Sequence, residues 1–485
     1  MANVDSTAFQ AWLNNRQARR CVLIELDNSD GNTVFTDYLA STKGYASRPD
    51  DVPPNQPYIS AILGSGAFNL RRSLNADYVV GDIEIDNGNG QFDHWRNRGF
   101  DGRGLRVYLG SPDWPKADFA LIHAGVCAGV VRKDQNIFVI KLRDRAYLTD
   151  VPFETSRFPS GPNQGRIYPT PIGQVRNMEA LLLNPATHVY VVSGRAIQSV
   201  DAVYENGVLL APSQYTVSLT TSPVTITFLA AAKGTITVDC KGVLLDGVWV
   251  NTVAAADQYA LRVRAGLTTA DLDTVAYANH SAAMPYTIGI LVADETTVAA
   301  FRTTLAAQSN GFAICRRDGR FALLRDEAPA STPLLTLLAG DQITRRASVV
   351  RREEPVRSWT IGYKKRWLVQ KNLPDNAMPP ATRAEVAQEF DVTTVTGTAS
   401  AKYLLAKDQS MQPSYFVSQV DAANECGRML SLRSNPRETL AIDCAVRPFA
   451  LDLGDTVQLT DASFARIVAI NEEPAAMRVS LEVQQ

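Results

Sequence analysis

The chain has 485 residues, of which 45% are hydrophobic and 20% are charged, so it can form several buried cores and its composition excludes a disordered protein. Its formal net charge of −2 gives no overall attraction to nucleic acid or to an anionic membrane. The first twenty residues lack the apolar core of a signal peptide, and the apolar run YTIGILVA is too short to cross a bilayer. We therefore expect a soluble protein, made in a cytoplasm, that does not insert into a membrane.

Closely spaced strand patterns dominate the first third of the chain. A short helical opening is followed by apolar or alternating segments with Gly or Asp turns between them: CVLIEL, YISAIL, YVVGDIEI, LRVYLG, ALIHAGVCAGVVR and NIFVIKLRD. Short strands at this spacing are typical of a barrel or sandwich. We assign 1–157 to an N-terminal β domain of a multi-domain, mainly β protein.

The segment GDIEIDNGNGQFD, residues 81–93, is compatible with a calcium loop or with a turn between two strands. Ca²⁺ prefers oxygen ligands, but Gly88 and Gly90 fall where an EF-hand loop needs ligands. Alternating apolar residues instead favour a strand, and the two Asn-Gly pairs favour a tight hairpin. We predict a hairpin with a type I′ turn at Asn87-Gly88, where a β-branched residue at position 88 would be strongly disfavoured.

A Pro- and Gly-rich stretch at 158–173 separates this region from a second group of strands. The strand patterns are HVYVVSG, IQSVDAVYENGVLL, YTVSL, VTITFL and GTITVDC. Asn206-Gly207 is a typical hairpin turn between two of them. We assign 158–250 to a second, smaller β domain.

The pattern then becomes helical. Val298, Phe301 and Leu305 share one helix face, and Asn310-Gly311 is a signal for the end of that helix. FAICRRDGRFALLR follows and predicts a hairpin closed around its Asp-Gly pair. We assign 251–335 to a small helix-plus-hairpin α+β module.

The last third returns to strands. The pattern predicts a strand at RSWTIGYKKRW and further strands near the C-terminus at ETLAIDCAV, DTVQLT and MRVSLEV. Between them lies a predicted helix whose apolar residues repeat at intervals of three and four: Ala422, Ala423, Cys426, Met429 and Leu430. We assign 336–485 to a C-terminal β domain with one helix.

Motifs of catalytic or metal-binding chemistry do not occur in this sequence. The H-E-x-x-H, G-x-S-x-G and P-loop patterns are missing, and GSGAF at 64–68 lacks the third Gly of a dinucleotide loop. His94 follows Asp93, but we interpret it as a surface residue beside a turn. The other histidines stand alone in the sequence: His123, His188 and His280. We therefore predict no enzyme activity, no catalytic, cofactor-binding or metal-binding residues, and no cofactor.

The six cysteines lie far apart within apolar segments: Cys21, Cys127, Cys240, Cys315, Cys426 and Cys444. A metal cluster needs paired spacing, whereas a free Cys often behaves as a small buried hydrophobe. We predict that these cysteines are structural.

A basic stretch lies at 345–366 and contains eight cationic side chains: Arg345, Arg346, Arg351, Arg352, Arg357, Lys364, Lys365 and Arg366. Trp359, Ile361 and Tyr363 share one strand parity, and a basic strand with interleaved aromatic residues is able to hold single-stranded nucleic acid. Two glutamates interrupt the run, however, and a dedicated binder normally has a basic domain. We expect no specific nucleic-acid binding and leave open whether this stretch meets a partner or solvent.

Several segments, in order along the chain, resemble the tail-tip and baseplate hub proteins of long-tailed bacteriophages, and also the hub proteins of gene transfer agents. The first is SAILGSGAFNLRRSLNADYVVGDIEIDNGNGQFD, followed by FDGRGLRVYLG and KLRDRAYLTDVPF. YPTPIGQVRNMEALLLN with VYVVSGRAIQSVDAVYENGVLL resembles a further domain of that family, and AANECGRMLSLRSNPRETLAIDCAVRPFALDLGDTVQLT resembles its closing unit. Each motif is common by itself, but the ordered set covers most of the chain.

The resemblance implies a structural virion protein located at the tail tip or baseplate. Such hubs form homotrimers in which two barrel-like β domains per chain match the six-fold tail tube, so that 1–157 and 336–485 would complete the hub. The implied partners are distal tail and tail-tube rings, the tape-measure protein and receptor-binding spike or fibre proteins, with DNA leaving through the lumen during infection. The alternatives are a distal tail ring or fibre-attachment collar protein and a tail-associated cell-wall hydrolase.

Overall fold

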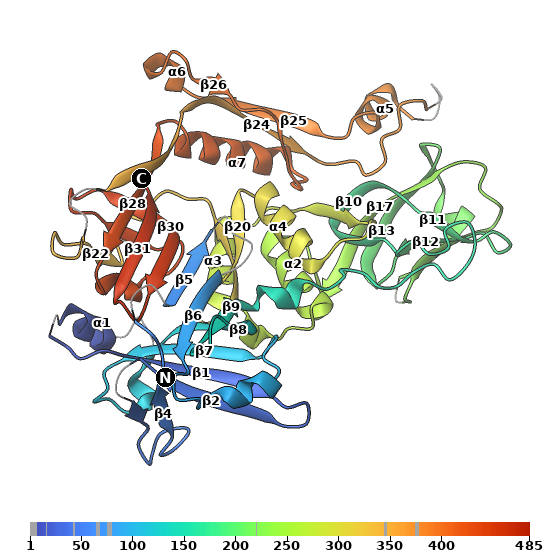
Figure 1. Ribbon diagram of the computed structural model, residues 1–485. Helices are drawn as coiled ribbons and strands as arrows, with labels where there is room; N and C mark the ends of the chain where they lie inside the picture. The colour runs from blue at the N-terminus through green and yellow to red at the C-terminus, as the bar shows by residue number, and fades with distance from the viewer. Residues whose placement is uncertain are drawn as a thin grey trace.

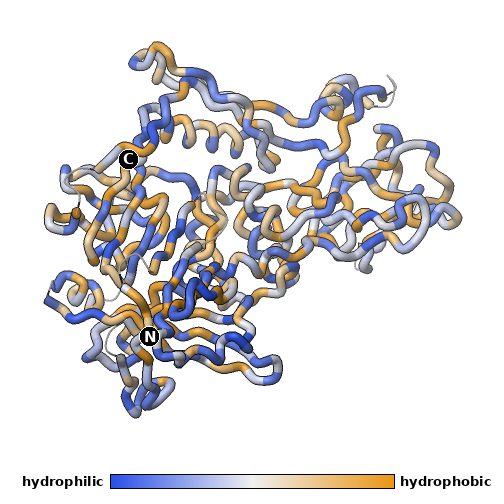
Figure 2. The backbone as a smooth tube through the Cα atoms, in the orientation of Figure 1, coloured by the Kyte–Doolittle hydropathy of each residue, from blue (hydrophilic) through white to orange (hydrophobic). Residues whose placement is uncertain are grey.

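The computed structural model describes most of the chain: residues 7–15, 17–41, 44–64, 68–74, 80–219, 221–343, 347–373 and 378–485. Within these residues, strands predominate and form one sheet of fifteen strands together with sheets of six, four, four and two strands. The prediction of a mainly β, multi-domain fold with a small α+β module is confirmed. Figure 2 shows hydrophobic and hydrophilic residues alternating along many strands, as expected for strands with one buried face.

The largest sheet, here called the main sheet, is built from both ends of the chain. Its N-terminal strands are β1 (Cys21–Ser29), β2 (Val34–Ala40), β3 (Tyr45–Ala46), β4 (Pro57–Ser60), β5 (Phe68–Ser73), β6 (Val80–Asp86), β7 (Gly104–Gly110), β8 (Ala120–Arg132) and β9 (Ile137–Arg143). Its C-terminal strands are β22 (Leu335–Thr336), β23 (Ser348–Glu353), β28 (Arg437–Cys444), β29 (Thr456–Gln458), β30 (Phe464–Glu473) and β31 (Arg478–Gln484). The two sets meet where β5 pairs with β30 in antiparallel register (Figure 1).

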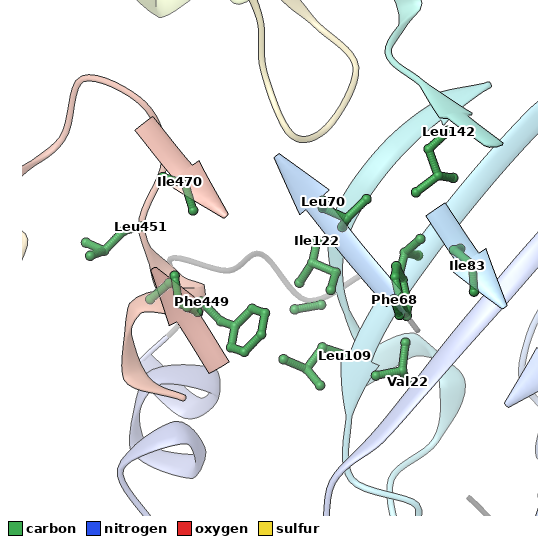
Figure 3. Packing of buried hydrophobic residues seen from close by; sticks show 14 of the residues in the cluster. Val22, Phe68, Leu70, Ile83, Leu109, Ile122, Leu142, Phe449, Leu451 and Ile470 are labelled. Carbon is green, nitrogen blue, oxygen red and sulfur yellow. The ribbon is translucent and has the colours of Figure 1, made fainter. Parts of the chain in front are cut away.

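The junction of β5 and β30 is backed by one shared hydrophobic core. Side chains from the N-terminal strands, such as Phe68 and Leu70, and from the C-terminal segment, such as Phe449 and Ile470, belong to the same buried cluster (Figure 3). Helix α1 (Thr7–Asn14) contributes Phe9 to this cluster. Because the apolar surface is shared, neither end of the chain can bury its own face without the other.

The second β region forms two smaller sheets. One contains β10 (Thr170–Glu179), β13 (Ile197–Glu205), β14 (Val208–Leu209), β17 (Ile236–Leu245), β18 (Val248–Trp249) and β19 (Gly289–Val292). The other contains β11 (Leu181–Asn184), β12 (Val189–Ser193), β15 (Tyr215–Ser218) and β16 (Val224–Phe228). The predicted hairpin turn is confirmed, because Asn206 and Gly207 have φ angles of 47° and 80° and connect β13 to β14.

The α+β module contains helices α2 (Val253–Tyr259), α3 (Thr274–Ala283) and α4 (Val298–Gln308), with the hairpin of β20 (Gly311–Cys315) and β21 (Phe321–Arg325). Helix α4 begins after Thr297, whose hydroxyl accepts a hydrogen bond from the Ala300 N–H. The predicted apolar face of this helix is confirmed, because its three residues are buried: Val298, Phe301 and Leu305.

A fourth region, here called the arm, consists of β24 (Val356–Tyr363), β25 (Asp391–Thr396), α6 (Ala399–Lys402), β26 (Lys407–Asp408), β27 (Gln412–Pro413) and α7 (Gln419–Leu432). Helix α7 packs along β24 and β25, and the arm lies across the top of the molecule in Figure 1. Helix α5 (Pro380–Val386) lies in the connection from β24 to β25. Among the described residues, no helix is long and apolar enough to cross a membrane.

The hairpin predicted within residues 81–93 is wrong. Strand β6 pairs with β5 and β9, and the chain after it enters a 3₁₀ helix, η1 (Asp93–Asn97), instead of returning as a strand. Asn87 and Gly88 are both described and neither has a positive φ, so there is no type I′ turn; the left-handed residue is Gly90, with a φ of 73°. The backbone angle at position 88 therefore does not disfavour a β-branched residue.

Asn87 does not form a two-residue turn because it makes hydrogen bonds to another loop and within its own loop. Its backbone N–H donates to the Asn136 carbonyl at 2.6 Å. Its buried side-chain oxygen accepts from the Phe92 N–H at 2.7 Å, and its amide donates to the Asp93 carboxylate at 3.1 Å. Asn87 therefore organises this loop through its side chain.

We predict that Asn87→Ala lowers the free energy of unfolding by about 1–3 kcal/mol, because the Phe92 N–H then loses its acceptor in a buried site. Urea denaturation measures this change. The matched control is Asn89→Ala, because Asn89 is exposed and accepts a single hydrogen bond, from the Gln91 N–H at 3.1 Å. Equal losses in the two variants would contradict the role assigned to Asn87.

Candidate assembly site

A buried ion network ties β5 to the C-terminal half of the main sheet. Arg72 on β5 pairs with Asp452 and, through Nη2, with Glu472 Oε2 on β30 at 3.0 Å. Arg317, in the turn between β20 and β21, reaches the other oxygen of Glu472 at 3.4 Å. The side chains of Arg72 and Glu472 are 1% and 0% exposed. We call these four residues the junction network.

The junction network joins three parts of the molecule. Arg317 Nη1 donates to the Phe449 carbonyl at 2.7 Å, and its other terminal nitrogen donates to the Leu451 carbonyl. The α+β module, the N-terminal strands and the C-terminal strands therefore converge on the same charges. Two arginines and two carboxylates balance in charge, which is the condition for keeping such groups buried.

The protonation of this region follows from burial and from neighbouring charges. Burial opposes ionisation of Asp452, but Arg72 and Arg317 hold its pKa at about 2. Asp455, whose carboxylate accepts from the Asp452 N–H at 2.6 Å, has its pKa raised to about 6 by burial and by the charge of Asp452. The folded protein therefore keeps a proton on Asp455 at a pH where the unfolded chain has released it.

A second group of ion pairs fixes the arm to the body. Asp326, just after β21, accepts from Arg433 at 2.9 Å and from Arg437 at 3.3 Å, and Arg433 also pairs with Glu353 on β23. Glu425 on α7, with a fully buried side chain, accepts from Arg325 at 3.1 Å. Main sheet, module and arm are therefore held in one arrangement by charged side chains.

The histidines considered in the sequence analysis do not come together. His94 is exposed, its Nδ1 lies 3.1 Å from the Gln91 carbonyl, and its Nε2 lies 3.8 Å from Asp37 rather than beside Asp93. His123 and His280 are buried, and burial lowers their pKa values to about 3 and about 4. Within the described residues, no group of three or more His, Cys, Asp or Glu side chains is placed to hold a metal ion.

All six cysteines are buried, as predicted. Burial raises the pKa values of the Cys127 and Cys426 thiols to about 11 and that of Cys444 to about 12. These thiols are therefore protonated near neutral pH and unreactive.

The described cations of the basic stretch are paired within the chain. Arg345 and Arg346 lie outside the described residues, and each of the other six forms an ion pair with a carboxylate. The pairs are Arg351–Glu353, Arg352–Glu354, Arg357–Asp408, Lys364–Glu385, Lys365–Glu389 and Arg366–Asp391. Trp359 and Ile361 are buried in the core that includes α7. The aromatic face therefore belongs to a core, and the cations pair with carboxylates of the same chain.

Sequence reasoning missed the junction network. One local signal was present, because Phe68, Leu70 and Arg72 share the inward parity of β5. An arginine at an inward position of a half-buried strand indicates a buried partner, but the positions of Asp452 and Glu472 cannot be derived from that pattern.

Comparison with known proteins gives structural similarity only. No family model matches the sequence, and no curated protein matches it. The chain is similar to a tail protein from Neisseria meningitidis (8% identity, TM-score 0.42), over 96% of this chain and 97% of that one. It is similar to the 43 kDa tail protein of prophage MuSo2 from Shewanella oneidensis (12% identity, TM-score 0.39), over 95% and 98%. A chain of a native gene transfer agent virion is 14% identical, with a TM-score of 0.44, over 68% and 86%.

We predict that Arg72→Met lowers the free energy of unfolding by about 3–5 kcal/mol, because Asp452 and Glu472 are left as uncompensated buried charges. Urea denaturation at pH 7 tests this. Arg71→Met is the matched control, since Arg71 is the exposed neighbour on the same strand. A loss below about 1 kcal/mol for Arg72→Met, in the range of surface pairs, would contradict the junction network.

We predict that Asp455→Asn stabilises the protein more strongly at pH 8 than at pH 4.5. Because the pKa of Asp455 is higher in the folded protein than in the unfolded chain, its protonated carboxyl stabilises the folded protein at low pH. This stabilisation, of about 1–3 kcal/mol, is lost as the pH rises from about 4 to about 6. Asparagine keeps the acceptor for the Asp452 N–H and has no charge to bury. Urea midpoints at both pH values measure the difference.

The control for that experiment is Asp461→Asn, because Asp461 hydrogen-bonds Ser463 and its pKa is lowered. Its effect on stability should be the same at pH 4.5 and at pH 8 within about 0.5 kcal/mol. If Asp455→Asn also gave equal shifts at both pH values, the protonation assigned to Asp455 would be wrong.

Proposed function

We propose that the chain is a non-enzymatic structural protein of a phage-like virion and forms the homotrimeric hub at the tail tip or baseplate. One observation carries this proposal. The hub-like segments GDIEIDNGNGQFD, FDGRGLRVYLG and KLRDRAYLTDVPF contribute strands to one main sheet, as does the closing unit that ends in FALDLGDTVQLT. Segments that lie far apart in the sequence therefore associate in one sheet.

The proposed hub consists of the regions 1–157 and 336–485, with 158–250 and 251–335 as a second β domain and an α+β module attached to it. The pairing of β5 with β30 supports a hub in which both ends of each chain contribute to one ring element. The junction network and the ion pairs of Asp326 would keep these parts rigid against each other. A rigid body is what a connector between structures of different symmetry requires.

The proposed partners are the distal tail and tail-tube rings on one side and a three-fold spike or fibre protein on the other, with the tape-measure protein inside. DNA would pass through the lumen during infection. Strong binding of DNA depends on unpaired Lys and Arg that release counterions from phosphates. The described cations of the basic stretch are already paired with carboxylates, which supports passage of DNA without specific binding.

We predict three copies of the intact chain per tail. Quantitative mass spectrometry of purified tails measures this number, with a tail-tube protein as the internal reference for copy number. Six copies would contradict the hub and favour a distal tail ring or a collar. Absence from purified tails would contradict a virion role altogether.

A further inference from the structure

Two adjacent leucines protrude from the arm. Leu404 and Leu405 are 87% and 91% exposed, in the turn that connects α6 to β26. The Ala406 N–H donates to the Tyr403 carbonyl at 3.0 Å and closes this turn. Single exposed leucines are common on protein surfaces, but two neighbouring leucines at the tip of one turn form a small apolar projection. We call Leu404 and Leu405 the leucine knob.

The leucine knob is held on both sides. Before it, the Tyr403 hydroxyl lies 3.3 Å from Asn435 Oδ1. After it, β26 pairs in parallel with β24, and Asp408 binds Arg357 and accepts from the Ser358 hydroxyl at 2.5 Å. Figure 1 shows α6 and β26 at the end of the arm, away from the second β region. A projection fixed in this way loses little conformational freedom on binding.

The charge around the leucine knob indicates the partner it fits. Residues 399–407 carry two positive charges, Lys402 and Lys407, and no acidic residue. Among the described residues, neither ammonium group has a carboxylate partner; Lys402 lies 3.4 Å from Asn435 Oδ1 and 5.0 Å from the ring centroid of Tyr403. An apolar pocket with carboxylates at its rim would bury the leucines and pair both lysines.

A protein pocket fits better than an anionic membrane. Stable binding to a membrane surface requires a long apolar face or a cluster of four to eight basic residues, roughly, in addition to an apolar anchor. Here two leucines are accompanied by two lysines, and the next charged residue, Asp408, is already paired with Arg357. Two side chains on a tight turn are instead suited to a pocket of matching shape.

We propose that the leucine knob inserts into an apolar, carboxylate-rimmed pocket on a different protein of the same particle. This inference rests on the proposed function and adds to it a contact that joins the arm to a neighbouring component. The turn provides the apolar anchor, and the lysines fix its orientation.

Photo-crosslinking in assembled particles tests the contact. A benzophenone amino acid replaces Leu404 in the full chain, and the crosslinked peptides are identified by mass spectrometry. We expect one discrete crosslink to a different protein of the particle, at a peptide that contains apolar residues and Asp or Glu. Lys402→Glu combined with Lys407→Glu should lower the yield of this crosslink at least ten-fold.

The matched control places the same amino acid at Val420, which is 66% exposed on α7 of the same arm and should not give this crosslink. A crosslink to a second copy of the chain, to lipid alone or to no molecule would overturn the proposal, as would a yield unaffected by the lysine changes. If particles contain three copies but no such crosslink, the docking contact alone is wrong. If purified tails lack the chain, both the docking contact and the proposed function are wrong.

Discussion

The antiparallel pairing of β5 with β30, closed by the buried Arg72–Glu472 ion pair, is the interaction on which the rest of the structure depends. The paired residues are separated by 400 positions in the sequence. A buried arginine is tolerated only when its carboxylates are in place, so the charges penalise every arrangement in which the two ends of the chain are apart. Hydrophobic burial drives the association, and the ion pair makes it specific.

Ion pairs also connect the main sheet to the α+β module and to the arm. Arg317 brings the α+β module to the junction network, and Asp326 connects that module to the arm through Arg433 and to the main sheet through Arg437. Each of these three regions contributes a charge that another of them neutralises. For a protein proposed to connect components of a tail, this arrangement explains how several small β units can behave as one rigid part and present an exposed feature such as the leucine knob in a defined position.

Much of the fold was predictable because period-2 and helical patterns are local. The strands β8 and β9, the helix face of Val298 and the turn at Asn206-Gly207 all depend on residues close in sequence. The turn at Asn87 was mispredicted because its backbone N–H donates to the carbonyl of Asn136, which lies in another loop. The junction network could not be predicted for the same reason: parity indicates that Arg72 points inward, but its partners are supplied by long-range pairing.

The most direct test of the account is an asymmetric cryo-electron microscopy reconstruction of the distal end of the tail at a resolution that distinguishes strands. We expect three copies of this chain around the axis at the end of the tube, each with strands β5 and β30 paired within the same subunit. Six copies in a ring, or a position away from the end of the tube, would contradict the proposed hub. Pairing of β5 with β30 from a neighbouring subunit would contradict the fold on which it depends.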